Sequence, residues 1–545
     1  MNSKNKKTTD MSRRSFMKTS AMSALGVASA SLISGVAPEV EAKTALVQSN
    51  GKYGFETPPS PIPSRMIREF ATADVIVVGG GISGVMAAKS AQENGAKVIV
   101  LQKGPVVMCH GFSMGCIDSK IQIEKNIRIN KMNAITELNY QSLNKPKFEL
   151  LKLWAEHSGE TFNWIDDMTT KHGVKGIFIP NAGTESGESG GKYWFNSYCT
   201  GHKWKGGMIV AINLVAKEAV KAGVEFRFNT PGKQLVQDKS GRITGVIAKH
   251  EITGDYIQFN AKKGVILCTG DYGNNPDMLQ KYCPAAVGLK SYYTPRHNTG
   301  DGHLMGIWVG AEMENGIHTK MAHVHSTPDF ADSDAPGRGM PWLAVQKEGK
   351  RLCNEDIPFY LMANQTLNAT NPDGLYYNIL DSDWEENLKQ FPPRVAGAID
   401  RQSFDEALSR GLIIKADKIE ELANKLNLPA ETFSKTVARY NELVEKGVDE
   451  DFGKIAVDLS FIKKAPFYGI PRLCCISAIL GGININTKMQ VLDKEQHIIH
   501  GLYAAGNVSG GFFGGANDYP FPIIGLSVGR ATTFGRLAGR YAAKG

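Results

Sequence analysis

The glycine-rich run GGGISG at residues 79–84 constrains the fold more than any other part of the sequence. It follows a short apolar segment, residues 74–78, and precedes residues 85–94, whose apolar side chains recur at helical spacing. Residues 97–101 form a second short apolar segment. In this order of strand, turn, helix and strand, G-x-G-x-x-G is the fingerprint of a dinucleotide-binding βαβ unit. The sequence therefore predicts an α/β fold of the Rossmann type.

Each glycine of the fingerprint has its own expected role. Gly79 permits the tight turn, Gly81 lets the backbone approach a pyrophosphate, and Gly84 lets the helix pack on the strand. The pyrophosphate is then expected at the helix N-terminus, on backbone N–H groups that include those of Ile82 and Ser83.

The second strand ends on Gln102 and Lys103, and both are predicted to lie at the cofactor. An acidic residue usually stands at the Gln102 position and accepts hydrogen bonds from the ribose. An amide oxygen accepts such a bond less strongly than a carboxylate. Binding is therefore expected to depend more on the pyrophosphate.

The N-terminus predicts export. Residues 12–18, SRRSFMK, resemble the twin-arginine export motif, and a weakly apolar stretch follows at residues 21–37. That stretch is too short and too polar for a membrane span, so we do not expect this chain to be an integral membrane protein. A chance arginine pair before a buried helix is the alternative. We expect residues 1–42 to be a signal peptide that directs the protein to the periplasm or cell surface, and residues 43–70 to be a linker.

Charge and cysteine content exclude several classes of protein. Loss of residues 1–42 would lower the net charge from +8 to about +5, and no basic run is interleaved with aromatic residues, so nucleic acid is not an expected partner. None of the eight cysteines forms a Cys-x-x-Cys pair, and the c-type haem attachment motif is absent. We expect unpaired thiols and no metal site.

The C-terminal part carries further motifs. A strand ending in a glycine turn is expected at residues 501–507, and a helix at residues 526–543. With CTGDYG at 268–273, TGDG at 299–302, GKRLCNE at 349–355 and TFGRLAG at 533–539, the chain resembles the flavoprotein superfamily of fumarate reductases, urocanate reductases and 3-ketosteroid dehydrogenases.

The resemblance implies a Rossmann-type FAD-binding domain in two pieces, residues 71–315 and 475–545, with an inserted α+β capping domain at 316–474. The N-terminus of the last helix would face the flavin pyrimidine ring and stabilise the anionic reduced flavin. His110 lies near the position where membrane-bound succinate dehydrogenases attach FAD, but its neighbours differ from theirs, so non-covalent FAD is expected. Further cofactor residues implied are Gly270, Asp301, Gly506, Asn507, Leu526 and Ser527.

Three features that hold a dicarboxylate in fumarate reductases are missing. No arginine follows Asn354 and Glu355, no histidine precedes Gly481, and Asp518 follows Asn517 where an arginine is expected. Charge-assisted hydrogen bonds contribute ~1.5–3 kcal/mol each. Loss of two arginines thus predicts roughly two to four decades weaker dicarboxylate binding. Fumarate is expected to be a poor substrate, and the Asp518 charge to disfavour it further.

Tyrosines and histidines are the remaining candidates for catalysis. Tyr519, in a DYP sequence, and Tyr360 resemble the tyrosines with which ketosteroid dehydrogenases polarise a ketone or handle a proton. Both could instead be aromatic residues of the core. His323 and His325 lie near the place of the family's substrate histidine, and a zinc site there would need ligands that the sequence does not indicate.

These features predict an exported reductase that transfers hydride from FAD N5 to an activated C=C bond of an enoate or enone. No NAD(P)H-binding domain or haem motif is evident, so a separate cytochrome or flavin protein is expected to supply electrons. The reverse reaction, a 3-ketosteroid-type dehydrogenation, is one alternative. An electron-transfer flavoprotein without its own small-molecule substrate is another.

Overall fold

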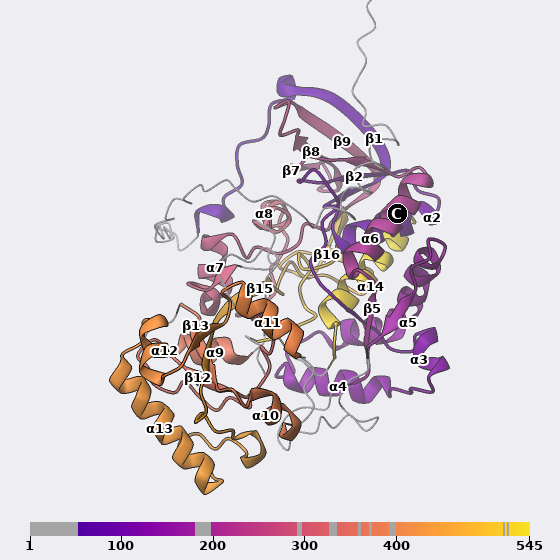
Figure 1. Ribbon diagram of the computed structural model, residues 1–545. Coiled ribbons are helices and arrows are strands. Elements are labelled where there is room, and N and C mark those ends of the chain that lie inside the picture. The colour runs from indigo at the N-terminus through magenta and orange to yellow at the C-terminus, as the bar shows by residue number, and fades with distance from the viewer. Residues whose placement is uncertain are drawn as a thin grey trace, which may run out of the picture.

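The computed structural model describes residues 53–179, 198–291, 297–325, 335–357, 361–369, 373–391, 399–515, 518–519 and 523–545. The expected signal peptide at 1–42, the first part of the expected linker, and Tyr360 lie outside these residues. The chain forms a domain around an eight-stranded sheet, a lobe around a six-stranded sheet, and a small three-stranded sheet (Figure 1).

The eight-stranded sheet is built on parallel pairing, which confirms the predicted Rossmann-type α/β fold. β1 pairs in parallel with β2 on one side and β9 on the other, and β9 pairs in parallel with β17. β7 and β8 form an antiparallel hairpin beside β9. The strands are β16 (Gln490–Leu492), β17 (Ile498–Ala504), β9 (Tyr256–Leu267), β1 (Ile67–Val78), β2 (Val98–Leu101), β6 (Glu225–Arg227), β7 (Gly232–Gln237) and β8 (Ile243–Lys249).

Two helices from opposite ends of the chain pack closely against each other beside this sheet (Figure 1). They are α2 (Ile82–Glu93) and α14 (Leu526–Ala542). A Cβ on Gly539 would lie 2.2 Å from the Ala87 carbonyl oxygen, and one on Gly535 would lie 2.4 Å from that of Ser83. Only glycine allows backbones to approach this closely, so α14 is fixed along α2.

The remaining helices of this domain surround the sheet and the pair α2 and α14. The long helix α5 packs on both α14 and α6, and the three-stranded sheet lies beside α14. The elements are α3 (Lys120–Glu124), α4 (Lys131–Gln141), α5 (Phe148–Thr170), α6 (Met208–Lys221), α7 (Pro276–Tyr282), α8 (Asp301–Trp308), β3 (Met114–Gly115), β4 (Gly176–Phe178) and β5 (Gly201–Trp204), with 3-10 turns at Gly54–Glu56, Ser64–Met66 and Pro284–Ala286.

The inserted lobe lies to one side of this domain, at the lower left of Figure 1. β15 (Phe467–Ile479) is the central strand of its sheet and pairs with β10, β11, β13 and β14. The expected boundary between residues 474 and 475 falls inside β15. The other elements are β10 (Lys290–Ser291), β11 (Lys320–His325), β12 (Leu343–Val345), β13 (Leu375–Leu380), β14 (Ile414–Ala416), α9 (Met362–Leu367), α10 (Trp384–Gln390), α11 (Arg401–Ser409), α12 (Ile419–Lys425), α13 (Ala430–Lys446) and a 3-10 turn at Ala456–Asp458.

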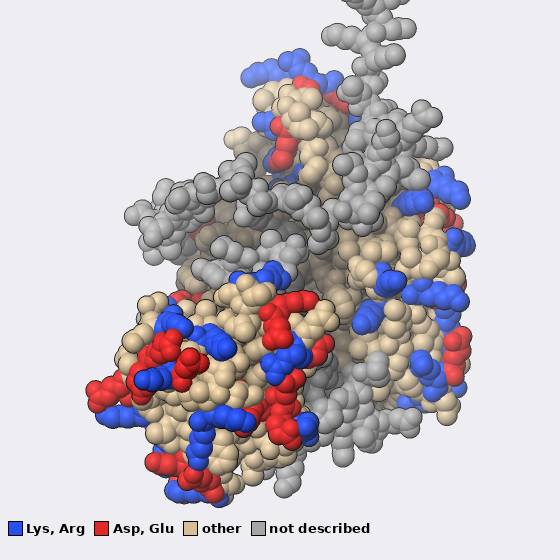
Figure 2. All heavy atoms as spheres, viewed as in Figure 1, with Lys and Arg blue, Asp and Glu red and all other residues tan. Residues whose placement is uncertain are grey.

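Acidic and basic side chains are interspersed over the visible face of the lobe (Figure 2). Many form ion pairs, such as Arg439 with Asp451 and Lys435 with Glu431. This face therefore carries no broad patch of one sign among the described residues. None of the helices that the structure describes is long and apolar enough to cross a bilayer.

Candidate active site

The glycine turn after β1 is held between two parallel strands. Gly79 has a φ of +109°, and a Cβ there would lie 2.2 Å from the Cys268 carbonyl oxygen at the end of β9. A Cβ on Gly84 would lie 1.8 Å from the carbonyl oxygen of Gly79. Both positions therefore require glycine. The first turn of α2 is pressed against the ends of β1 and β9.

Gly81 differs from these two glycines because a side chain there would meet no close backbone contact within the protein. A Cβ there would meet nothing nearer than the Met108 carbonyl oxygen at 3.6 Å. Gly81 is also the N-cap of α2, and no side chain caps this helix end. The N–H groups that follow, including those of Ile82 and Ser83, are suited to an anionic ligand such as a pyrophosphate.

Gln102 and Lys103 are engaged with the protein. Gln102 Oε1 accepts a hydrogen bond from the Gly80 N–H at 2.9 Å, and its Nε2 donates to the Val106 carbonyl. Gln102 therefore shapes the glycine turn, a role that the sequence did not reveal. Lys103 Nζ lies 3.0 Å from Asp301 Oδ2 and donates to Thr299 Oγ1 at 2.8 Å. The structure thus brings together two predicted cofactor residues, Lys103 and Asp301, from distant parts of the chain.

The loop that follows β9 borders the same edge of the sheet. Gly270 has a φ of +78°, and a Cβ there would lie 2.8 Å from Asn298 Oδ1. The preceding Thr269 hydroxyl is buried and has no hydrogen-bond partner among the described residues. Burial raises the pKa of the neighbouring Asp271 carboxyl to about 6. An unsatisfied hydroxyl at this position fits a ligand that supplies the missing hydrogen bond.

A buried arginine holds the loop after β17. The guanidinium of Arg530, on α14, donates to the Gly506 carbonyl at 2.7 Å, to the Ser509 carbonyl at 3.0 Å and to Asn507 Oδ1 at 3.1 Å. Burial lowers the pKa of Arg530 to about 10, so it stays charged at neutral pH. Arg530 therefore fixes the loop that carries Gly506 and Asn507.

Glu314 is a buried carboxyl that the sequence did not single out. Its side chain accepts hydrogen bonds from the Gly511 N–H at 2.6 Å and from the Gly482 N–H at 3.3 Å. Burial raises the pKa of Glu314 to about 7. Glu314 thus joins two glycine loops, and no local sequence pattern indicates this because both partners are more than 160 residues away.

Tyr519 lies at the N-terminus of α14. Gly525 is the N-cap of this helix, with a φ of +73°, and Leu526 and Ser527 form its first turn. The Ser527 N–H donates to the Tyr519 hydroxyl at 3.1 Å. The ring is buried beside Phe513, with centroids 5.6 Å apart, and burial raises the pKa of the phenol. The structure therefore brings Tyr519 together with Leu526 and Ser527.

The charge of Asp518 has a partner that the sequence did not predict. Lys320 Nζ, at the start of β11, lies 2.5 Å from Asp518 Oδ1. The negative charge of Asp518 is therefore paired with an ammonium group beside Tyr519. The sequence signal for this pair is Lys320 itself, a lysine within the largely uncharged segment IHTKMAHVH at residues 317–325.

The histidines of this region lie in different places. His318 is buried, with Nδ1 2.6 Å from the Tyr272 hydroxyl, and burial lowers its pKa to about 3. His323 and His325 lie further along β11, about 10 and 17 Å from Lys320 at 3.3 Å per residue. Their rings stack with centroids 6.4 Å apart. The residues that the structure describes contain no cluster of metal-ligating side chains.

His110 lies in the loop after β2. Burial lowers the pKa of its imidazole to about 4, and the ring contacts the Ser477 backbone of β15. Non-covalent FAD stays a prediction. None of the eight cysteines forms a disulfide.

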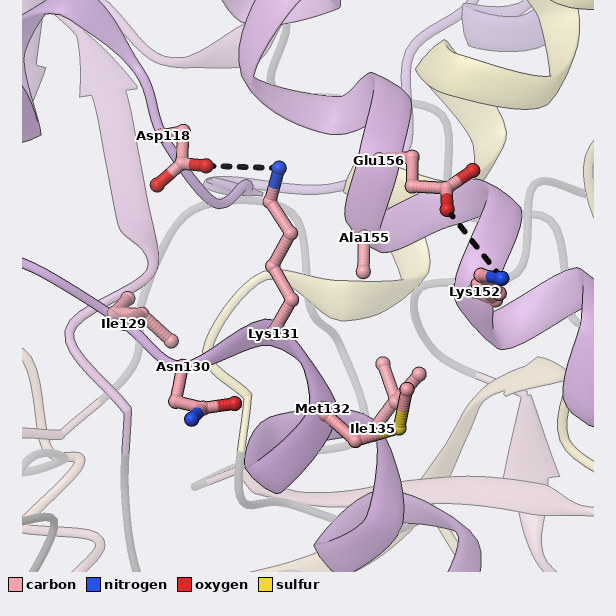
Figure 3. Close-up of a pocket in the computed structure, with 9 residues that line it drawn as sticks. All are labelled: Asp118, Ile129, Asn130, Lys131, Met132, Ile135, Lys152, Ala155 and Glu156. Carbon is pink, nitrogen blue, oxygen red and sulfur yellow. Dashed lines mark ion pairs between the residues drawn. The ribbon is translucent and has the colours of Figure 1, made fainter.

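A surface hollow of about 360 Å³ lies between α4 and α5, away from the glycine loops (Figure 3). Its charged residues are paired with one another: Lys131 with Asp118 at 2.8 Å, and Lys152 with Glu156 at 3.9 Å. None of the predicted site residues lines it, so this hollow is not the candidate active site.

The arrangement around α2 and α14 fits FAD. The lack of a close backbone contact at Gly81 and the uncapped N-terminus of α2 suit the pyrophosphate. The loops of Gly270 and Gly506 border the same end of the parallel strands, where ligands bind in open α/β sheets. The positive end of α14 adds a second place for negative charge.

Known proteins agree with this fit. Vinyl phenol reductase of Lactiplantibacillus plantarum is 28% identical over 498 residues, which cover 86% of this chain and 96% of that protein. A 3-oxosteroid 1-dehydrogenase of Mycolicibacterium smegmatis is 32% identical over 343 residues, covering 58% of this chain and 59% of that protein. The open conformation of a flavocytochrome c3 fumarate reductase superposes with a TM-score of 0.67 at 26% identity, covering 87% of this chain and 78% of that one.

A family model for the FAD binding domain matches residues 74–520, which is most of the chain. The match begins within β1, covers the inserted lobe and ends just after Tyr519, before α14. The chain therefore belongs to the FAD binding domain family and is an FAD-dependent oxidoreductase.

Proposed function

We propose that this protein reduces the activated C=C bond of an uncharged substrate or a monocarboxylate, with Tyr519 as the group that polarises or protonates it. The coarser activity, reduction or dehydrogenation at a carbon–carbon bond, is what the relatives' names describe. FAD, when bound, supplies the hydride for such a reduction.

The position of the Tyr519 hydroxyl carries the proposal. The Ser527 N–H at the start of α14 donates to this hydroxyl, and a phenol can both accept and donate hydrogen bonds. Burial raises the pKa of Tyr519, so the phenol keeps its proton at neutral pH and can donate a hydrogen bond to a carbonyl as negative charge develops there. Tyr519 would hold the substrate carbonyl and move a proton at that point.

The charges around the site support a substrate with fewer than two carboxylates. Arg530 is committed to backbone carbonyls, and Lys320 is paired with Asp518. Recruiting either cation to a carboxylate would break existing hydrogen bonds in a buried place, which is unfavourable. A second carboxylate could therefore use neither of these two cations without such an exchange, although Arg338 could still hold one carboxylate.

A substrate panel tests this proposal. Under anaerobic conditions, with reduced viologen as electron donor, we expect enones and monocarboxylate enoates to be reduced with kcat/KM roughly 100-fold above that of fumarate, because two arginine contacts are missing. Oxidation of the viologen gives the rate. Heat-inactivated protein is the control, and rapid turnover of fumarate would contradict the proposed substrate class.

Tyr519→Phe tests the role of the phenol. The variant should lose turnover by ~10²-fold or more, a typical share for general acid catalysis, while its flavin content stays unchanged. The matched control is Tyr541→Phe, at the far end of α14, which should keep full activity. Normal turnover of Tyr519→Phe would reduce Tyr519 to a packing residue.

The reverse direction is a second candidate, favoured by the similarity to a 3-oxosteroid 1-dehydrogenase. A phenol that stabilises negative charge on a carbonyl oxygen serves the removal of hydrogen beside that carbonyl equally well. Anaerobic incubation with saturated ketones and an artificial electron acceptor would test this direction, with reduction of the acceptor giving the rate.

We also propose that the protein is exported by the twin-arginine route and receives electrons from a separate cytochrome or flavin protein. The motif at residues 12–18 supports export, and the absence of a haem attachment motif from the sequence supports an external donor.

Replacing Arg13 and Arg14 by lysine should leave active, flavin-loaded protein in the cytoplasm, because the arginine pair is the recognised element of the signal. Fractionation followed by the viologen assay measures this. Lys6→Arg with Lys7→Arg, outside the motif, should be exported normally. Equal export of the arginine-pair variant would refute the twin-arginine assignment.

A further inference from the structure

Lys320, Asn364 and Asp518 form a closed ring of hydrogen bonds next to Tyr519. Lys320 Nζ donates to Asp518 Oδ1 at 2.5 Å and to Asn364 Oδ1 at 2.8 Å. Asn364 Nδ2 donates to Asp518 Oδ2 at 2.9 Å. The Lys320 side chain is only 2% exposed. Each member of this ring, which we call the Lys320 cluster, is thus bonded to the other two.

The three residues come from three separate parts of the chain. Lys320 begins β11, the strand that leads into the lobe, and Asn364 lies on α9 within the lobe. Asp518 lies between the glycine loop at 510–511 and α14, directly before Tyr519. The Lys320 cluster therefore ties the lobe to the segment that carries the phenol.

The backbone makes the same connection. The Tyr519 N–H donates to the Lys320 carbonyl at 3.1 Å, and Lys320 and Asp518 form a parallel bridge. The hydroxyl of Tyr519 is held separately by the Ser527 N–H. The tyrosine is thus fixed at its backbone by Lys320 and at its hydroxyl by α14.

A buried ammonium group is strongly unfavourable without partners, so Lys320 keeps Asp518 in place. Moving Asp518 would displace Tyr519, its neighbour. A shift of about 1 Å at a catalytic group can lower the rate by ~10²-fold. Lys320 can therefore affect catalysis without contacting the substrate.

We propose that Lys320 is a positioning residue for Tyr519, acting through Asp518 and Asn364. This inference rests on the proposed function, because it gives Lys320 a catalytic effect only if Tyr519 acts on the substrate. It makes Tyr519 competent only while the lobe, through Asn364, is docked on the FAD-binding domain.

A double-mutant cycle tests the inference on the full-length, flavin-loaded protein. We compare the wild type, Lys320→Met, Tyr519→Phe and the double variant in the viologen assay with the best alkene of the panel. Lys320→Met should lower kcat by ~10- to 100-fold, with KM changed less than about threefold. Because Lys320 acts through Tyr519, the kcat of the double variant should be within about threefold of the kcat of Tyr519→Phe alone.

The outcomes separate the two proposals. Losses that multiply in the double variant, or full kcat in Lys320→Met, would overturn the positioning role and leave the role of Tyr519 intact. Full activity of Tyr519→Phe would overturn the assignment of Tyr519 in the proposed function and this inference with it.

Two further variants test the inference in case Lys320→Met fails to fold. Asp518→Asn keeps the shape of the Lys320 cluster while removing one charge, and it should show the same non-additivity with Tyr519→Phe. The matched control is Lys454→Met, which removes another buried lysine, one that donates to Tyr440 at 2.8 Å and lies 3.3 Å from Glu355 within the lobe. Any activity change in Lys454→Met should multiply with that of Tyr519→Phe. Non-additivity for Lys454→Met as well would overturn the specific link between Lys320 and Tyr519.

Discussion

The close approach of α2 to the strands and to α14 is the constraint on which the rest of the site depends. Gly84 allows α2 to begin against the turn at Gly79, and Gly535 and Gly539 allow α14 to lie along α2. As a result, two helices from opposite ends of the sequence direct their N-termini toward one region. Each N-terminus carries a partial positive charge of about half a unit, so the pair suits a ligand with negative charge at two places, as in reduced FAD.

The buried charged side chains of this region hold the loops around the two helices. Arg530 lies one turn into α14 and is surrounded by the carbonyls of the loop that it holds, while Glu314 accepts N–H groups from two glycine loops. Lys320 and Asp518 neutralise each other next to Tyr519. The charges of this region therefore stabilise the protein's own loops. In the proposed function, a phenol rather than one of these cations would meet the substrate.

Sequence reasoning located the parts of the site that depend on local pattern. The glycine fingerprint, the strand before it and the helix after it follow from spacing alone, and α14 begins at Leu526 as expected. The partners of Glu314 and Lys320 did not follow, because they lie on distant segments of the chain. The partners of Gln102 are closer in sequence but depend on the conformation of the glycine turn. The expected domain boundary at 474 falls inside β15, because this strand continues to Ile479 as the central strand of the lobe's sheet without a break in composition.

The most direct test of the account is the oxidative half-reaction. The purified protein is reduced anaerobically, mixed with a single alkene of the enone or monocarboxylate class, and followed by flavin absorbance. We expect a yellow protein that bleaches on reduction and regains its oxidised spectrum rapidly when the alkene is added, with the saturated product formed in equal amount. A protein without flavin, or one that stays bleached with every alkene tried, would contradict it.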